Sequence, residues 1–462
     1  MVSYVRWSLL LVPLLGLAAC QTAQKSVSLK EAKSITANFV GKSVETPPRG
    51  IEDLLATLAK YDGKPDEKTA NLLVKANKKL TPEIEAEPKK LMKFLFGRML
   101  ARQNLGMGQE ALDDARRVLP LVYKYNKSSQ KDSDYSRGGM FTNIAWSELE
   151  YGKLSEAIKI SQASLDSSSA PSWAYSQMAR FLIWQGKLEE AEKMISRVKS
   201  LRSGKKRDHH VPRLLAMMAD AKGEWTEAEA FHRTSYSAIK SRGNEDWANK
   251  SLSLSSRRIA KSVANQGRLS EAELILRNEL KTLLKRHKTY KTDSVAIILL
   301  EISNIMQKAG KFENSIVLST KVQDILKEIN YPQASWINAG AYRSRATSYL
   351  ALRNLVKARA LFDEQKEVYS KIAPLAYKKW YKPNLNRLLT NVLTDPSSED
   401  FKDIDENYEH SLKHLGAKHY KTAEFAGLKA IYLYKNGKAQ EAKELFEGAF
   451  KILNSRSRRA NG

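Results

Sequence analysis

The stretch Gly152-Lys-Leu154-Ser-Glu156-Ala157 decides the fold, because the chain repeats it between residues 106 and 442. Close copies run from Gly186 to Ala191, from Gly223 to Ala228 and from Gly267 to Ala272, and looser copies run from Gly310 to Ser315 and from Gly437 to Ala442. Gly106 with Ala111, and Arg353 with Leu355 and Ala358, keep the same spacing. Self-similarity of this kind is the sequence signature of a repeat architecture. The stretch therefore predicts one structural unit, stacked many times.

A second small residue stands seven positions before each turn residue. These residues are Ala145, Ala179, Ala216, Ala260, Ser303, Ala346 and Ala430, and only the first copy departs, with Met99. Glycine suits the turn because it tolerates the left-handed conformation that ends a helix. The two small residues mark the place where two helices approach each other closely. Each copy therefore predicts a helical hairpin.

This pattern resembles the tetratricopeptide repeat, which places small residues before and after a glycine-rich turn. The resemblance implies an all-α fold, a right-handed α-α superhelix of stacked tetratricopeptide-type helix hairpins. It covers about residues 88–454, with room for about eight to nine repeats. Residues 51–87 are expected to form N-terminal capping helices, since a stacked solenoid needs a polar-faced end.

The repeats become longer along the chain. Gly152 and Gly186 lie 34 residues apart, whereas Gly223 and Gly267 lie 44 apart. The later units resemble the longer class found in kinesin light chain and in arrays that precede caspase-like CHAT domains. Arg353 and Gly437 lie 84 residues apart, which leaves room for one degenerate repeat around 383–415.

The first twenty residues resemble the export signal of a bacterial lipoprotein. Arg6 precedes an apolar stretch, 8–18, that is too short to cross a bilayer and has the length of a signal-peptide core. It ends in Leu17-Ala18-Ala19-Cys20, which resembles a lipobox, and Cys20 is the only cysteine in the chain. The resemblance implies a signal peptide over 1–19, cleavage between Ala19 and Cys20, and an acyl anchor on Cys20. An ordinary secretory signal with an incidental cysteine is the alternative.

The residues after the cysteine bear on location. Residues 20–50 comprise the acylated cysteine and a polar segment ending in Pro47-Pro48-Arg49-Gly50, which predicts a flexible tether. Gln21 stands where an aspartate resembles an inner-membrane retention signal. Glutamine in place of aspartate at this position therefore favours the outer membrane, with the folded body in the periplasm.

The chain is strongly basic. Lys and Arg number 77 against 51 Asp and Glu, a net charge of +26. The basic residues are dispersed and are not interleaved with aromatic residues as in RNA-binding proteins, so an acidic protein partner is favoured over nucleic acid. Lys205, Lys206 and Arg207 are the candidate partner-binding patch, and residues 455–462 are expected to form a basic disordered tail.

No motif of catalysis stands out. The chain contains no glycine-rich phosphate loop, no His-Glu-x-x-His motif and no nucleophile elbow. His410 and His414 lie four apart on a predicted helix, with Glu406 and His419 nearby, and solvent-facing histidines are favoured over a metal site. We expect no enzyme activity, no metal and no cofactor.

The sequence therefore predicts a lipid-anchored periplasmic scaffold that binds protein partners along the groove of a superhelix. At the level of fold it resembles lipoproteins of envelope-complex assembly, which is an analogy. Two alternatives stay open. One is a regulator or substrate of a separate caspase-like CHAT protease, suggested by repeat length. The other is an electrostatic binder of an anionic envelope polymer or nucleic acid, suggested by charge.

Overall fold

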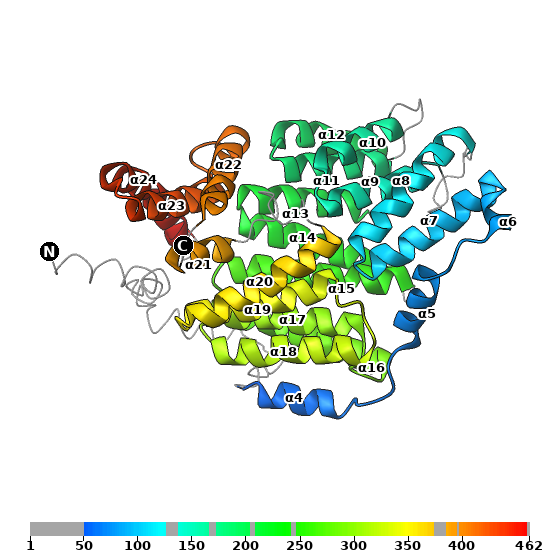
Figure 1. Ribbon diagram of the computed structural model, residues 1–462, viewed down its shortest axis with the longest axis horizontal. Coiled ribbons are helices and arrows are strands. Elements are labelled where there is room, and N and C mark those ends of the chain that lie inside the picture. The colour runs from blue at the N-terminus through cyan, green and yellow to red at the C-terminus, as the bar shows by residue number, and fades with distance from the viewer. Residues whose placement is uncertain are drawn as a thin grey trace, which may run out of the picture.

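The computed structural model describes residues 50–125, 137–165, 172–203, 208–241, 246–373, 385–394 and 397–459. The first helices are α4 (Glu52–Ala59), α5 (Glu67–Ala76), α6 (Pro82–Glu85), α7 (Pro88–Asn104), α8 (Gly108–Tyr125), α9 (Arg137–Tyr151), α10 (Leu154–Leu165), α11 (Ser172–Gln185), α12 (Leu188–Leu201), α13 (His210–Lys222) and α14 (Trp225–Lys240). The later helices are α15 (Asp246–Asn265), α16 (Leu269–His287), α17 (Asp293–Lys308), α18 (Phe312–Glu328), α19 (Trp336–Ala351), α20 (Leu355–Ile372), α21 (Leu385–Thr394), α22 (Ser398–Leu415), α23 (Tyr420–Lys435) and α24 (Ala439–Arg459). The described residues contain no β-strand, and from α7 onward consecutive helices pair as hairpins (Figure 1).

The hairpins are made by one repeated turn. Positive φ angles occur at the turn glycines Gly106, Gly152, Gly186, Gly223, Gly267, Gly310 and Gly437, and at Arg353. The residue after each of these donates its backbone N–H to a carbonyl five residues back, as Lys153 does to Glu148 and Lys311 to Met306. This bond defines a Schellman motif, which satisfies carbonyls left free at a helix end.

The small residues lie inside the hairpins. Ala145, Ala157, Ala179, Ala191, Ala216, Ala228, Ala260, Ala272, Ser303, Ser315, Ala346, Ala358, Ala430 and Ala442 are all buried. A larger side chain at these positions would hold the two helices of a hairpin apart, because interaxial distances depend on the side chains at the contact. The chain is thus an all-α superhelix of stacked tetratricopeptide-type helix hairpins.

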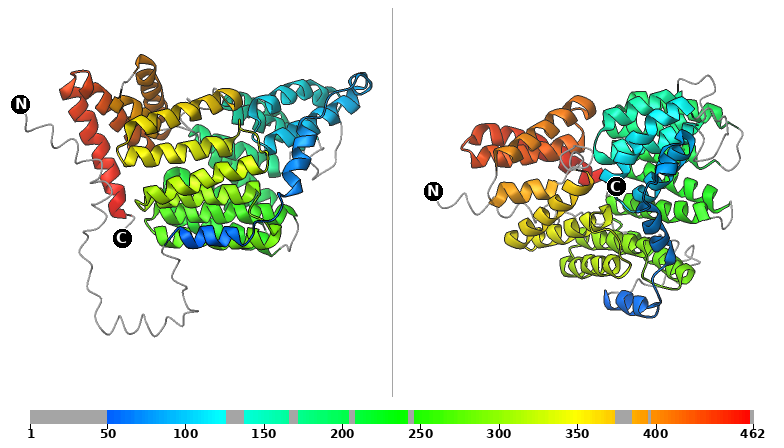
Figure 2. Two further views of the ribbon diagram at one scale, coloured as in Figure 1. Left: turned by 60° about the horizontal axis from the view of Figure 1, so that its bottom comes forward. Right: turned by 45° about the vertical axis from the view of Figure 1, so that its right-hand side comes forward.

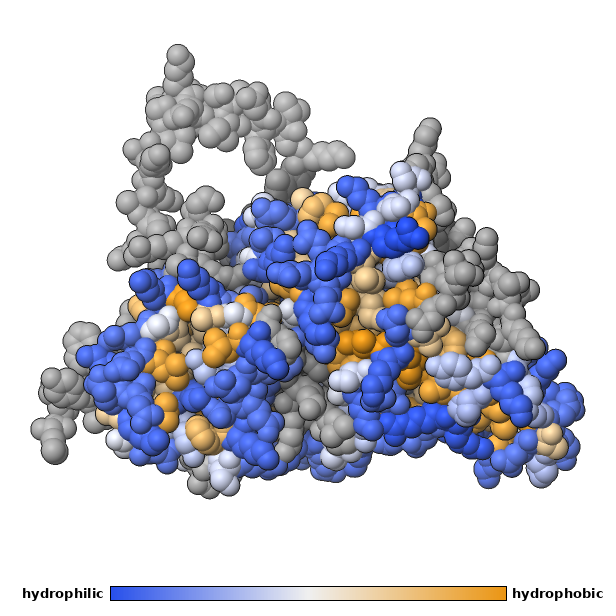
Figure 3. All heavy atoms as spheres, turned by 90° about the horizontal axis from the view of Figure 1, so that it is seen from above, coloured by the Kyte–Doolittle hydropathy of each residue, from blue (hydrophilic) through white to orange (hydrophobic). Residues whose placement is uncertain are grey.

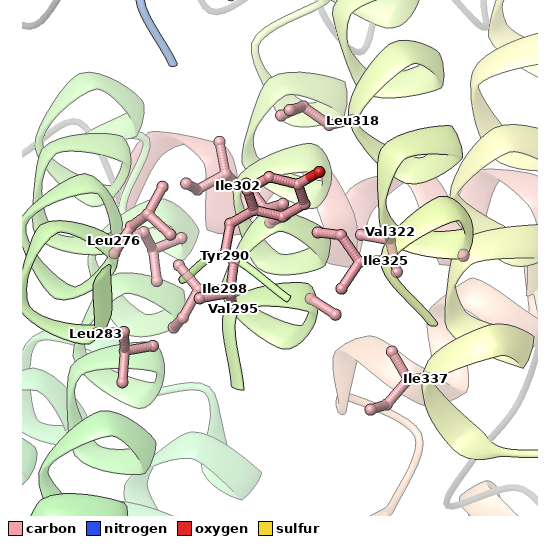
Figure 4. Packing of buried hydrophobic residues seen from close by; sticks show 14 of the residues in the cluster. Leu276, Leu283, Tyr290, Val295, Ile298, Ile302, Leu318, Val322, Ile325 and Ile337 are labelled. Atoms are coloured by element: carbon pink, nitrogen blue, oxygen red, sulfur yellow. The ribbon is translucent and has the colours of Figure 1, made fainter. Parts of the chain in front are cut away.

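Branched apolar side chains join neighbouring hairpins. Figure 4 shows Leu276 and Leu283 of α16 facing Val295 and Ile298 of α17, with side chains of α18 on the other side. This cluster, the largest in the described residues, continues to Ile337 of α19. A helix buried against neighbours on two sides needs such a broad apolar stripe.

The superhelix curls until its first hairpin meets its seventh, α19–α20 (Figures 1 and 2). The Tyr331 hydroxyl donates a hydrogen bond to the Asn104 carbonyl across 3.1 Å. Leu105 joins the same apolar cluster as Ile329 and Tyr331. Segments separated by 227 residues are thereby in direct contact.

The segment expected as an N-terminal cap, 51–87, divides between two places. Helix α5 lies beside α7, where Arg102 donates to the Ala76 carbonyl across 3.1 Å. Helix α4 lies instead along the outer side of α16–α18 (Figures 1 and 2). The backbone N–H of Tyr290 donates to Tyr61 across 2.9 Å, and Lys291 pairs with Asp62 at 2.7 Å.

Several predicted features fall at the ends of the described chain. Helix α24 continues to Arg459, five residues into the segment 455–462 that we expected to be disordered. Cys20, Ala19 and the rest of 1–49 lie outside the described residues, as do Lys205, Lys206 and Arg207. Among the helices of the described residues, none combines the length and the apolar character needed to cross a membrane.

Candidate partner-binding groove

Three arginines come from the first helices of three successive hairpins, the helices expected to line the inner face of the stack. Arg180 lies on α11, Arg213 on α13 and Arg258 on α15, and each is partly exposed. Burial, and then the charge of Arg213, lowers the pKa of Arg180. Burial, and then the charges of Arg213 and Arg180, lowers the pKa of Arg258. The three guanidiniums, which we call the arginine row, are thus close enough to repel one another.

The arginine row lacks neutralising partners. In the described part of the chain, no carboxylate lies within 4.0 Å of any of its three side chains. The Nε of Arg180 donates only a long bond, 3.3 Å, to the Ser176 carbonyl, and its guanidinium lies 5.6 Å from the centre of the Trp146 ring. The Nε of Arg213 is buried without a hydrogen-bond partner among the described residues. Buried polar groups are normally satisfied, so this arrangement is poised for an anion.

Asp220, the acid that influences Arg258, already has hydrogen-bond partners of its own. Asp220 of α13 raises the pKa of Arg258, but only as a minor cause. Its Oδ2 lies 3.1 Å from Nε2 of His232, and its Oδ1 accepts a hydrogen bond from the Ser262 hydroxyl across 3.2 Å. Asp220 therefore compensates the charge of the arginine row only in part.

A cavity of about 590 Å³ adjoins the row. Its lining residues are Ile183, Trp184, Met217, Asp220, Ala221, Trp225, Arg258, Lys261, Asn265, Leu415, His419, Tyr420, Lys421, Glu424 and Leu453. They come from α11 and α13–α15 on one side and from α22–α24 on the other. Aromatic, aliphatic and cationic side chains thus share one concave surface, as ligand-binding pockets commonly do.

Apolar surface is also available outside the cavity. The face seen from above in Figure 3 carries hydrophobic patches surrounded by hydrophilic side chains. Hydrophobic anchors within a polar rim are typical of protein interfaces.

The sequence favoured solvent-facing side chains for His410 and His414, but His410 is only partly exposed and its Nε2 is buried. Within the described residues, no three side chains of His, Cys, Asp or Glu are placed to hold a metal ion. His419 instead accepts the backbone N–H of Lys421 at the start of α23, and its Nε2 lies 2.8 Å from the Ala221 carbonyl. It joins α23 to α13.

The sequence pattern pointed to Lys205, Lys206 and Arg207, on the condition that they rim the concave face, and it did not indicate the arginine row. The signal that would have found the row is an arginine on the first helix of three successive repeats. Arg180 lies 6 residues before its turn glycine, Arg213 lies 10 before and Arg258 lies 9 before. These unequal offsets conceal the row when the repeats are aligned by their turns.

No protein-family model matches the chain, and no curated protein matches it. Some solved structures are similar to it. The nearly identical repeats of a putative kinesin light chain from Podosopora anserina are 17% identical, with 43% of this chain and 93% of that chain covered and a TM-score of 0.32. A Rap protein complexed with competence and sporulation factor is 9% identical, with 79% of this chain and 99% of that chain covered and a TM-score of 0.48. BtubC from P. vanneervenii is 11% identical, with 67% and 91% covered and a TM-score of 0.30. The assignment of a repeat fold rests on the turns and helix pairs of this chain itself.

Proposed function

We propose that this protein is a membrane-tethered adaptor that holds an acidic segment of a partner protein on its arginine row. The observation that carries the proposal is the absence of a carboxylate partner for Arg180, Arg213 and Arg258 within the described residues. Partial burial of a charge without a partner is unfavourable, and an incoming carboxylate relieves that cost by forming charge-assisted hydrogen bonds. Guanidinium groups suit this role because they bind carboxylates in a bidentate fork.

The tether in this proposal is the acyl chain expected on Cys20. The lipobox-like Leu17-Ala18-Ala19-Cys20 supports it, together with Gln21 for the outer membrane. The adaptor would then work in the periplasm, bringing its partner to the membrane surface. Stable anchoring requires more than one acyl chain, as in bacterial lipoproteins.

The test is a crosslinked pull-down from membranes with wild type and the pair Arg180→Gln and Arg213→Gln. Loss of two charge-assisted hydrogen bonds is expected to weaken partner binding by about 1.5–3 kcal/mol per arginine, at least tenfold each. The matched control is the pair Arg197→Gln and Arg343→Gln, which removes the same charge from exposed positions. Equal partner recovery from both pairs would overturn the role of the row.

A second arm addresses the tether. Cys20→Ser is expected to leave the folded body intact and to release it from the membrane fraction, because the only cysteine carries the anchor. Retention of Cys20→Ser in the membrane contradicts the lipid anchor and leaves the arginine row to be judged by the first arm alone.

Salt dependence distinguishes the adaptor from a binder of anionic polymer or nucleic acid, which the net charge of +26 would suit. Binding to a polyelectrolyte releases counterions, so its affinity falls steeply with salt concentration. A segment held by a few partly buried guanidiniums and by apolar anchors is expected to lose less affinity over the same range. A steep slope that is unchanged by Arg180→Gln would favour the polymer.

A further inference from the structure

The cavity beside the arginine row is closed by the C-terminal part of the chain. Helix α23 starts against the α13–α14 turn, where His419 Nε2 lies 2.8 Å from the Ala221 carbonyl. Tyr420 meets the ring of Trp225 edge to face, with centroids 5.9 Å apart. The cavity thus lies at a junction between the middle of the array and its last hairpins.

Cations line the cavity from both sides of this junction. Arg258 and Lys261 belong to α15, whereas Lys421 belongs to α23. Burial, and then the charge of Lys261, lowers the pKa of Lys421. Like charges therefore oppose each other across the junction and work against the contact that His419 makes.

Two acids, Asp220 and Glu424, also line the wall, against the three cations. Asp220 is engaged by His232 and Ser262. Glu424 lies on α23 beside Lys421 and raises the pKa of Lys421, but as a smaller cause than burial and the charge of Lys261, which lower it. An anion entering between Lys421 and Arg258 would attract both sides at once.

Much of the remaining cavity wall is apolar, which favours a ligand that carries apolar groups as well as a negative charge. Trp184 and Ile183 of α11, Met217 of α13 and Leu415 of α22 line the same space. A volume of about 590 Å³ falls in the range of small-ligand pockets. Aromatic and aliphatic walls favour an occupant that buries an apolar side chain beside its charge.

We propose that this cavity binds a short polypeptide segment in which acidic side chains alternate with apolar ones, and that binding clasps α23 onto α13–α15. This inference rests on the adaptor function and specifies the segment that the adaptor takes. The coupling is reciprocal, so a segment that favours the docked α23 binds more tightly when α23 is docked.

The binding test uses the full chain carrying Cys20→Ser and an array of immobilised octapeptides. The array contains the arrangements of Asp, Phe, Leu and Ser, with a matched set in which Asn replaces Asp. We expect acidic–apolar members to bind and their Asn counterparts to fail. Lys261→Gln and Lys421→Gln are each expected to weaken binding about tenfold, the worth of one charge-assisted hydrogen bond.

The matched control is Lys418→Gln, which removes one charge at an exposed position near the start of α23 and outside the cavity lining. It is expected to leave binding within about twofold, as surface charges do. Thermal unfolding of every variant checks that the fold is retained. If no acidic–apolar peptide exceeds its Asn counterpart, the proposed ligand class is wrong.

The clasp is tested by a distance across the junction. Lys222→Cys and Lys418→Cys place spin labels at exposed positions on α13 and beside α23, in the chain that Cys20→Ser leaves without other cysteines. The best octapeptide is expected to shorten and narrow the distribution of label distances, and its Asn counterpart to leave it unchanged. Binding without any change in that distribution would overturn the clasp.

Two further outcomes separate this inference from the adaptor proposal. If Arg180→Gln with Arg213→Gln abolishes partner capture while Lys421→Gln alters neither peptide binding nor label distance, the adaptor stands and the cavity ligand falls. If inorganic phosphate at the same concentration shortens the distance as much as the octapeptide, the cavity takes a simple anion and the polypeptide assignment is wrong.

Discussion

The turn residues have a measurable geometric requirement. Gly310 has φ +75°, and Gly106, in the first hairpin, has φ +72°. A side chain in this left-handed region costs about 1–2 kcal/mol because its Cβ approaches the following carbonyl. The two glycines differ in surroundings. A Cβ on Gly310 would meet no atom within 4 Å, whereas one on Gly106 would lie 3.2 Å from the backbone nitrogen of Trp336.

The first prediction compares these two turns. Gly310→Ala is expected to destabilise the chain by about 1 kcal/mol, which is the cost of the left-handed conformation less the entropy that alanine removes from the unfolded state. Gly106→Ala is expected to cost more, because its Cβ also presses on the α19 backbone. Urea unfolding of both variants measures the difference. Equal losses would show that the contact between Gly106 and α19 is not formed in solution.

The turns and the arginine row differ in how far sequence determines them. The turn glycines and their small partners are local, so they follow from spacing within a single repeat. Arg180, Arg213 and Arg258 lie 33 and 45 residues apart, and their proximity depends on how successive hairpins rotate against one another. Nothing within one repeat specifies that rotation. A contiguous patch such as Lys205-Lys206-Arg207 is therefore easier to notice than the row.

At the scale of helices, the degenerate unit α21–α22 shows what replaces the missing turn glycine. Arg387 of α21 bonds both Asp400 and Asp403 of α22, at 3.2 and 3.1 Å, and all three side chains are buried. Ser397 and Asp400 form a capping box at the start of α22. Polar contacts thus hold two helices that the repeat pattern could not define beyond leaving room around 383–415.

The second prediction concerns this cap. Ser397→Ala is expected to cost about 1 kcal/mol, because it removes a side-chain acceptor from the first turn of α22. Burial alone would raise the pKa of Asp400, but hydrogen bonds from Asn391 and Ser397 outweigh burial and lower it. Asp400 therefore adds stability above the unfolded-state pKa of about 4, and this stability is lost as pH falls through its lower folded value. Ser397→Ala is expected to move that loss to higher pH.

Thermal unfolding followed by circular dichroism between pH 7 and pH 2 measures both effects. Ser398→Ala is the control, since it makes the same change one residue later, at an exposed position inside the helix. An identical pH profile for Ser397→Ala and wild type would contradict the role of the capping box in lowering the pKa of Asp400.

The position of α4 is a feature that local sequence could not supply. Ile51 at the N-cap and Leu54 and Leu58 of α4 are buried, and the sequence predicted that this segment caps the N-terminal end of the array. The covering surface is the cluster of α16–α18, reached because Tyr61 and Asp66 bond the backbone of Tyr290 and Lys291. These partners lie more than 200 residues away along the chain. Such long-range pairing depends on the completed superhelix.

At the scale of the whole molecule, the superhelix curls far enough for its first hairpin, α7–α8, to contact its seventh, α19–α20. The first hairpin reaches the seventh at two backbone contacts. A Cβ on Gly106 would approach Trp336, and a Cβ on Gly108, the first residue of α8, would lie 2.2 Å from the Ile372 carbonyl oxygen. Repeat arrays are stabilised mainly between neighbours, so a contact between distant repeats couples parts that would otherwise open independently.

The third prediction tests whether this closure holds in solution. Gly108→Ala is expected to open the contact between α8 and α20, because no Cβ fits beside the Ile372 carbonyl. Gly427→Ala in α23 is the matched change, since a Cβ there would meet no atom within 4 Å. That variant is expected to stabilise the chain by about 0.5–1 kcal/mol, through the higher helix propensity of alanine.

Small-angle scattering is expected to give a larger radius of gyration for Gly108→Ala alone, and hydrogen exchange is expected to quicken at the end of α20. Both variants would have the wild-type radius if the first and seventh hairpins did not touch, and the arginine row would then lie on an open concave face.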